Sequence, residues 1–244
     1  MATNSLPLPV LRWKPAVVAF FLLLGSGIAK SEVLFRDDFN HLDNWAPYTF
    51  KNIARQTLYR IEKHGGSQVL VATSSASASA LISTIRFSVE EHPILRWRWK
   101  VGNIYTSGNY RQKSGDDYPI RVYVIFEYHP ERADFGTKVK YQLAKTLYGQ
   151  YPPHSSINYI WANRAEEQET VANPFTERAM MIPLQYGGEN VGRWVEEEVN
   201  VYQDYLKAFG EPPPPVASLA IMSDSDNTGE SATAYLDFIE IGSP

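Results

Sequence analysis

The stretch that decides the fold is Leu95-Arg96-Trp97-Arg98-Trp99-Lys100-Val101, in which apolar and basic residues alternate. Successive side chains of a β-strand point to opposite faces, so a period of two separates the apolar residues from the cations. The apolar face is Leu95, Trp97, Trp99 and Val101, and the basic face is Arg96, Arg98 and Lys100. The pattern predicts a strand whose tryptophans pack in a core while its basic face lies in water or lines a groove.

Similar short segments recur along the chain and are separated by turn residues, which is typical of a sandwich or a barrel. The predicted strands are Leu34–Phe39, Leu58–Lys63, Gln68–Thr73, Ala80–Phe87, Ile94–Val101, Ile120–Tyr128, Ile157–Ala162, Ala179–Gln185, Trp194–Val201, Val216–Ser223 and Ala234–Ile241. Two short helices are expected at Lys138–Tyr148 and Val201–Phe209, the second ending at Gly210. The predicted fold class is all-β, a jelly-roll-like antiparallel β-sandwich with one or two short helices.

The amino terminus has the parts of a secretory signal peptide in the usual order. Arg12 and Lys14 precede the apolar run Ala16–Leu24, and Gly27-Ile28-Ala29 supplies small residues for cleavage before Lys30. The run is shorter than the roughly 20 apolar residues of a membrane-spanning helix. We therefore expect a signal peptide over residues 1–29, a single β-sandwich domain over residues 30–244, and a periplasmic or secreted protein with no membrane span after cleavage.

Charge and cysteine content exclude several classes of function. The formal net charge is −4, and removal of Arg12 and Lys14 with the signal peptide makes it −6. An acidic protein is poorly suited to nucleic acid, whose binding depends on neutralising phosphates. The sequence contains no cysteine, which rules out disulfides, thiolate catalysis and thiolate metal sites. No G-x-S-x-G motif and no regular histidine spacing occurs, so no catalytic residue is assigned.

Acidic residues lie beside a second strand of alternating character. Asp116 and Asp117 precede a strand on which Arg121 and Tyr123 share one face. Adjacent carboxylates at such a junction cap backbone amides, bind a hard cation, or act as acid and base. If Arg121 shares a sheet face with Arg96 and Arg98, the carboxylates would be salt-bridge partners of these arginines.

Two further acidic groups suggest calcium. The loop Ser223–Gly229 carries Asp224, Asp226 and Asn227, which partly match a calcium loop but lack its terminal glutamate. A turn stabilised by Asx hydrogen bonds is the alternative. Asp38 and Asp237 belong to the first and last strands, which jelly rolls often place side by side. No cofactor is certain; a structural calcium ion held by Asp38 with Asp237, or by Asp224 with Asp226, is expected.

The ordered set of motifs resembles the bacterial exported family known as domain of unknown function 3047. The resemblance rests on the following segments, which span nearly the whole mature chain: Asp37-Asp38-Phe39, Trp45, Leu95–Val101, Gly115–Tyr118, Arg121–Phe126, Tyr159–Ala162, Trp194, Asn200-Val201, Asp204-Tyr205, Ala208–Gly210 and Ile221–Thr228. The segment Asn163–Thr176 does not align. The resemblance implies export and a single domain but no established activity.

Three functions remain open. The leading hypothesis is a glycan-binding protein whose partner is an acidic polysaccharide or another envelope glycan, bound by guanidinium groups and aromatic rings. The residues proposed for this site are Arg96, Arg98, Asp116, Asp117, Arg121, Tyr123, Tyr159, Trp161, Asp226 and Asn227. The first alternative is a polysaccharide-active enzyme such as a lyase, with Tyr123 or His154 as the base. The second is a structural envelope protein without a small ligand.

Overall fold

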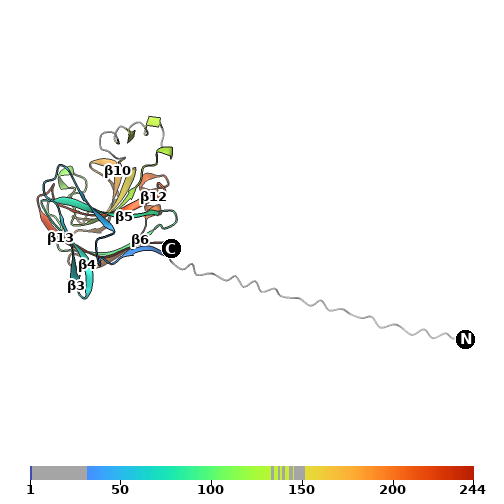
Figure 1. Ribbon diagram of the computed structural model, residues 1–244, viewed down its shortest axis with the longest axis horizontal. Coiled ribbons are helices and arrows are strands. Elements are labelled where there is room, and N and C mark those ends of the chain that lie inside the picture. Colours follow the sequence, from blue (N-terminus) through green and yellow to red (C-terminus); the bar gives the residue numbers. More distant parts are fainter. Residues whose placement is uncertain (2–31, 133–134, 137, 139–140, 143–144, 146–151) are drawn as a thin grey trace. The chain divides into compact units, whose positions relative to one another are not determined.

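The computed structural model describes residue 1, residues 32–132 and 152–244, and residues 135, 136, 138, 141, 142 and 145. It divides into two units, Met1–Lys30, of which only Met1 is described, and Ser31–Pro244. The second unit holds all the described strands, which form two sheets in two layers (Figure 1). Among the described residues, no helix combines the length and the apolar character that crossing a membrane requires.

The first sheet has six strands in the order β11-β6-β13-β4-β3, with β1 also paired to β13. Its strands are β1 (Val33–Asp37), β3 (Leu58–His64), β4 (Ser67–Ser75), β6 (Ile94–Val101), β11 (Val195–Asn200) and β13 (Ser231–Gly242). All of its pairs are antiparallel. The first and last strands therefore lie side by side, as the expectation for Asp38 and Asp237 assumed.

The second sheet has seven strands in the order β2-β5-β12-β7-β8-β10-β9. Its strands are β2 (Trp45–Thr49), β5 (Ala78–Ser88), β7 (Arg121–Phe126), β8 (Ser155–Ala162), β9 (Val171–Asn173), β10 (Thr176–Tyr186) and β12 (Val216–Asp224). One pair departs from the antiparallel prediction, because β10 runs parallel to β8. Parallel neighbours need a crossover connection, and here residues 163–175, with β9 inside them, carry the chain back to the starting edge.

Among the described residues, the short helices with defined bounds are α2 (Val201–Phe209) and the 3-10 turns η1 (Lys113–Gly115) and η2 (Pro130–Arg132). Helix α2 has the predicted bounds. The side chain of Asn200 caps its start by accepting from the Gln203 amide at 3.0 Å, and Gly210 ends it with a φ of 73°. The other predicted helix, Lys138–Tyr148, lies largely outside the described residues.

Aromatic pairs join the two sheets through the core. On β6, Trp97 and Trp99 are fully buried, as the alternation predicted. Trp97 lies 5.4 Å from Tyr159, and Trp99 lies 5.7 Å from Trp161, measured between ring centroids. Tyr159 and Trp161 are on β8, so these contacts connect the two layers. The prediction of an all-β sandwich with a short helix is confirmed.

Candidate functional site

Arg121 is the centre of a buried polar network at the start of β7. Its guanidinium forms an ion pair with Asp224, and its Nη1 lies 3.7 Å from Asp116 Oδ1. The rings of Tyr118 and Tyr123 lie 4.7 and 5.4 Å from its guanidinium carbon. Its side chain is 4% exposed, so the predicted carboxylate pairing is present but no open surface lies above the charge.

Asp116 and Asp117 hold loops in place around this arginine. Asp116 accepts from the Tyr118 hydroxyl at 3.0 Å and from the Asn173 amide at 2.8 Å. Asp117 accepts from the Thr228 backbone at 2.6 Å and from the side-chain amide of Asn227 at 2.9 Å. Buried carboxylates that accept several N–H bonds fix local structure. These two residues therefore order the loops 102–120 and 224–228.

The charges of the network act on one another. Complete burial raises the pKa of Asp224 well above its usual range, and Arg121 opposes that rise. Burial alone would lower the pKa of Arg121, but Asp224, Tyr123 and Asp116 raise it well above the usual value. Burial also raises the pKa of Asp226, and the neighbouring carboxylate of Asp117 adds to that rise. The guanidinium thus stays charged and is the cation that the buried carboxylates share.

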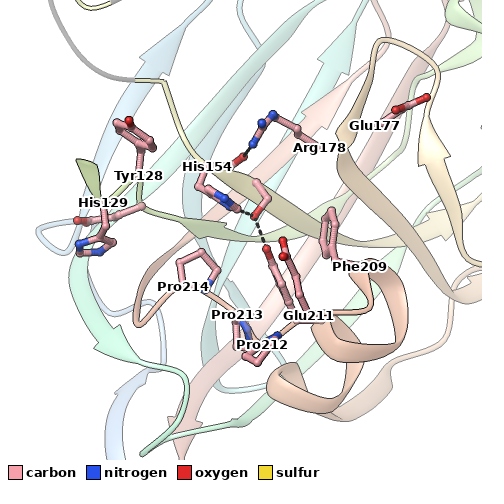
Figure 2. Close-up of a pocket in the computed structure, with 13 residues that line it drawn as sticks. Tyr128, His129, His154, Glu177, Arg178, Phe209, Glu211, Pro212, Pro213 and Pro214 are labelled. Carbon is pink, nitrogen blue, oxygen red and sulfur yellow. Dashed lines mark hydrogen bonds between the residues drawn. The ribbon is translucent and has the colours of Figure 1, made fainter. Parts of the chain in front are cut away.

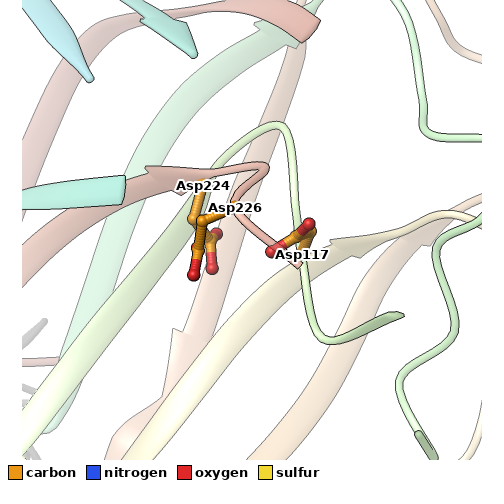
Figure 3. A group of neighbouring side chains, drawn as sticks. All are labelled: Asp117, Asp224 and Asp226. Atoms are coloured by element: carbon orange, nitrogen blue, oxygen red, sulfur yellow. The ribbon is translucent and has the colours of Figure 1, made fainter. Parts of the chain in front are cut away.

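Three of these carboxylates lie close together. Asp117, Asp224 and Asp226 each offer an oxygen within 4.8 Å of the others (Figure 3). Oxygen ligands suit a hard cation. However, Asp224 is already paired with Arg121 and Asp117 already accepts from loop amides, so only part of their capacity remains for an ion. The calcium expectation at Asp224 and Asp226 stays a prediction.

The other expected calcium ligands are both engaged by arginines. Asp38 accepts from Arg36 at 2.8 Å, and Asp237 accepts from Arg98 at 3.0 Å. A cation there would have to compete with two guanidinium groups. This second calcium expectation also stays a prediction.

The expected arrangement of one arginine face is wrong. Arg96 and Arg98 lie on β6 in the six-stranded sheet, whereas Arg121 lies on β7 in the seven-stranded sheet. Arg96 forms ion pairs with Glu198 at 2.6 Å and Glu240 at 3.3 Å, because β11 and β13 flank β6 and bring these carboxylates to its outer face. The basic face of β6 is therefore largely neutralised by its neighbouring strands.

Two aromatic residues of the expected site also lie elsewhere than predicted. Tyr159 and Trp161 are fully buried between the sheets, so they pack in the core rather than form a platform for sugar rings. The Tyr159 hydroxyl donates to Asp204 of α2 at 2.9 Å. Tyr123 alone of the expected aromatic residues reaches a surface groove.

That groove lies on the outer face of the seven-stranded sheet and has a volume of about 570 Å³. Its aromatic lining comes from Tyr48, Phe50, Tyr123, Phe126 and Tyr128. Arg86 and Glu127 also line it and form an ion pair at 2.6 Å. Sequence reasoning missed the groove because β2, which carries Tyr48, contains Pro47 and was not predicted as a strand.

A second cleft, of about 600 Å³, adjoins this groove and shares Glu127 and Tyr128 with it. Figure 2 shows His154 and Arg178 on one side of the cleft and the prolines 212–214 on another. Burial, with the charges of Arg178 and His129, lowers the pKa of His154, and Glu211 opposes this. His154 is thus a neutral imidazole near pH 7.

Comparison with known proteins gives one broad match and several distant ones. A stretch of 134 residues is 25% identical to laccase-1 of Emericella nidulans, covering 55% of this chain and 21% of the laccase. The Trichoderma harzianum endoglucanase 3 of family GH12 superposes with a TM-score of 0.41 at 11% identity, over 87% of this chain and 97% of that one. The family 30 carbohydrate-binding module of a Clostridium thermocellum cellulase gives a TM-score of 0.39 at 12% identity, over 81% and 90%.

Structural similarity at these TM-scores does not indicate a shared ligand or activity. The family match is of a different kind, because it covers most of the chain, from residue 43 to residue 240. It agrees with the resemblance carried by the sequence motifs. The chain belongs to the family described as protein of unknown function DUF3047.

Proposed function

We propose that this protein binds glycans in the groove on the outer face of its seven-stranded sheet. One observation carries the proposal: a concave surface of about 570 Å³ lined by five aromatic residues and a single ion pair. Binding sites for small ligands are typically clefts of about 300–1,000 Å³ with mostly apolar walls and few polar groups. Aromatic rings offer flat apolar faces to sugar rings, and the ion pair offers hydrogen bonds to hydroxyls.

We expect Tyr48 to make the main aromatic contact with the glycan, because its side chain is exposed. Tyr48 is 41% exposed, so its ring is available to a ligand without rearrangement. Tyr123 forms the floor of the groove, where its hydroxyl donates to Met222 Sδ at 3.5 Å. The exposed ring of Tyr48 is able to adapt to a ligand, whereas the ring of Tyr123 is already held in position before binding.

An acidic saccharide is the finer form of the proposal. The arginines first expected to bind it are paired or buried, which leaves Arg86 as the cation of the groove. Its side chain is 70% exposed and faces Glu127. A uronate carboxylate would replace Glu127 as the partner of Arg86, since guanidinium groups bind carboxylates in a bidentate fork.

The test is calorimetric titration with neutral and uronate-containing oligosaccharides of matched length. We expect Tyr48→Ala to weaken binding by more than about 1 kcal/mol, roughly fivefold in Kd. Tyr186→Ala is the matched control, because Tyr186 is 40% exposed but lies outside the groove lining. Arg86→Lys should weaken only uronate binding, and this binding should fall with added salt.

Two kinds of result would contradict the proposal, one for the acidic ligand and one for glycan binding in the groove. Equal affinity for neutral and acidic chains would remove the acidic refinement alone. No measurable binding of any glycan, or equal losses for the Tyr48 and Tyr186 variants, would remove the groove. The structural envelope protein would then be the better interpretation, since Arg96, Arg98 and Arg121 all stabilise the sandwich through ion pairs.

The lyase alternative loses one of its bases. Burial raises the pKa of Tyr123 above its usual value, so its phenol stays protonated and does not accept a proton from a sugar near pH 7. His154 remains as a base, but it lies in the adjoining cleft rather than on the groove floor.

A further inference from the structure

The adjoining cleft contains a chain of three protic groups. The Nδ1 atom of His154 lies 2.9 Å from Ser155 Oγ, and Ser155 Oγ lies 3.0 Å from the Tyr205 hydroxyl (Figure 2). All three residues line the cleft. A serine within hydrogen-bond reach of an imidazole is the basic arrangement for activating a hydroxyl as a nucleophile.

Each member of the chain is held in place by contacts with neighbouring strands or with α2. The His154 backbone amide donates to Phe126 O at 2.9 Å, and Arg178 donates to the His154 carbonyl at 3.0 Å. Ser155 begins β8, which β7 and β10 flank. The Tyr205 ring, on α2, packs on Phe126 with a centroid separation of 4.5 Å. Two strands and a helix therefore fix the geometry before any ligand arrives.

The directions of the hydrogen bonds follow from the protonation states. Burial raises the pKa of Tyr205, so its phenol keeps its proton and is able to donate to Ser155 Oγ. The Ser155 hydroxyl then donates its own proton to His154 Nδ1, which is unprotonated in this tautomer of the neutral imidazole. In this arrangement the serine donates its proton to a base, as proton removal requires, and the phenol would stabilise the negative charge that develops on Oγ.

We infer that Ser155 is a nucleophile for acyl transfer, with His154 as its base and Tyr205 as a positioning residue, and that the cleft accepts an uncharged carboxylic ester. The lining favours this substrate class. Glu177 and Glu211 would repel an anion, while Phe209 and the prolines 212–214 form an apolar wall for an alkyl or acyl group. Arg178 brings a positive charge to the cleft, where it would stabilise an oxyanion.

The reaction balances without a further reagent except water. Ser155 Oγ bonds to the ester carbonyl carbon, and its proton passes to His154 Nδ1. The carbon–oxygen bond to the alcohol then breaks, and the alcohol takes that proton. Water attacks the acyl-serine in the second half, giving its proton to His154, and the carboxylic acid leaves as the serine hydroxyl is restored.

The first test is covalent labelling of the full chain with a small alkyl fluorophosphonate. Ser155 is only 4% exposed, which is why a small probe is needed. The serine oxygen bonds to phosphorus as fluoride leaves, and intact mass followed by peptide mapping reports the adduct. We expect one adduct on Ser155, none in Ser155→Ala, and an unchanged adduct in Ser156→Ala. Ser156 is the matched control because it is adjacent in sequence but does not line the cleft that holds His154.

The second test separates chemistry from structural support. The labelling rate should rise with pH through the pKa of His154, with a midpoint below the ordinary histidine value of 6.5. Burial contributes most to the lowered pKa of His154, Arg178 and His129 lower it further, and Glu211 opposes them. Glu127 and Glu177 also line the cleft. His154→Gln should slow labelling by about 10²-fold or more. Tyr205→Phe should slow it while circular dichroism stays native.

Hydrolysis of p-nitrophenyl acetate provides the turnover measurement. Ser155→Ala should reduce hydrolysis to the rate of buffer alone, whereas Ser156→Ala should hydrolyse the ester at the wild-type rate. An adduct that persists in Ser155→Ala, a labelling rate independent of pH, or no adduct on the folded wild-type protein would overturn the inference. None of these outcomes bears on glycan binding at Tyr48, so the two proposals fail separately.

Discussion

At the scale of single residues, Arg121 is the charge whose removal we expect to cost the most. Arg121→Met would leave Asp224 and Asp116 buried without their cation, and breaking a buried pair in this way costs about 3–5 kcal/mol. Chemical denaturation should show this loss in the free energy of unfolding. The control is Arg98→Met, whose ion pair with Asp237 is 41% exposed on the arginine side and should cost less than about 1 kcal/mol.

A double replacement then tests the mechanism of that loss. Arg121→Met combined with Asp224→Asn removes the unpaired charge as well as its partner. We expect part of the lost stability to return, because two uncharged side chains carry no charge into the core. Equal stability of the Arg121 and Arg98 single variants would contradict a structural role for the buried pair.

Glu197 offers a residue-scale prediction about pH. Its Oε1 accepts from Trp99 at 3.1 Å and from Gln185 at 2.8 Å, while burial raises its pKa above the ordinary 4.5. A raised folded pKa means that the protonated form contributes stability below the unfolded pKa and that this contribution is lost as pH rises through the folded value. Glu197→Gln keeps an acceptor and removes the charge, so it should be more stable than wild type at pH 7.

Thermal melts at several pH values check this expectation. The advantage of Glu197→Gln should disappear below about pH 4.5, where wild-type Glu197 is also protonated. Glu198→Gln is the control, since its carboxylate pairs with Arg96 at the surface and gains nothing from neutralisation. If Glu197→Gln is less stable than wild type at pH 7, the prediction is wrong. The negative charge of Glu197 would then strengthen its hydrogen bonds with Trp99 and Gln185 by more free energy than its burial costs.

At the scale of elements, the calcium expectation concerns the loop after β12. The carboxylates of Asp117, Asp224 and Asp226 repel one another, and a bound cation would relieve that repulsion. We expect chelator to lower the melting temperature and calcium to restore it, by a small amount because Arg121 already neutralises Asp224. Asp226→Asn should remove the response, whereas Asp38→Asn should remove it only if the ion lies between β1 and β13. No shift in the wild-type protein would exclude both sites.

Individual strands were predictable where one face is apolar and the other is not. The alternation in β6 identifies its buried face, because Trp97 and Trp99 alternate with cations. The segment that forms β8 carries apolar residues on both faces, and nearly all of it is buried. Its period therefore does not tell which side faces the core, and the expectation that Tyr159 and Trp161 contact a saccharide is wrong because both rings are buried.

Neighbour relations between strands were not predictable from local pattern. Arg96 and Arg121 lie on strands of similar character, yet β6 pairs with β11 and β13 while β7 pairs with β12 and β8. Some of these pairings join residues more than a hundred positions apart, such as Arg96 and Glu198. Asp116 was predictable as a partner of Arg121 because it is near it in sequence, whereas the pairing with the distant Asp224 was not predicted. The groove and the cleft were not, since they form only when distant strands meet.

At the scale of the whole molecule, export would determine the compartment in which the protein acts and the residue at which its mature chain begins. We propose that the protein is periplasmic or secreted and that its mature form begins at Lys30. The supporting sequence features are the cations Arg12 and Lys14, the apolar run Ala16–Leu24 and the small residues before Lys30. Removal of the segment makes the chain more acidic, from −4 to −6, which favours solubility over adhesion to anionic membranes.

Intact mass and amino-terminal sequencing of protein recovered from the periplasm or the medium test this proposal. We expect one species that begins at Lys30. Ala29→Leu places a large residue where cleavage needs a small one, so the uncleaved chain should accumulate in the membrane fraction. Ser26→Ala is the control, because it changes a neighbouring position without removing a small residue. Recovery of the wild-type chain with Met1 intact in the membrane fraction would show that the apolar run is retained as an anchor. The groove and the cleft would then face their ligands from a tethered protein.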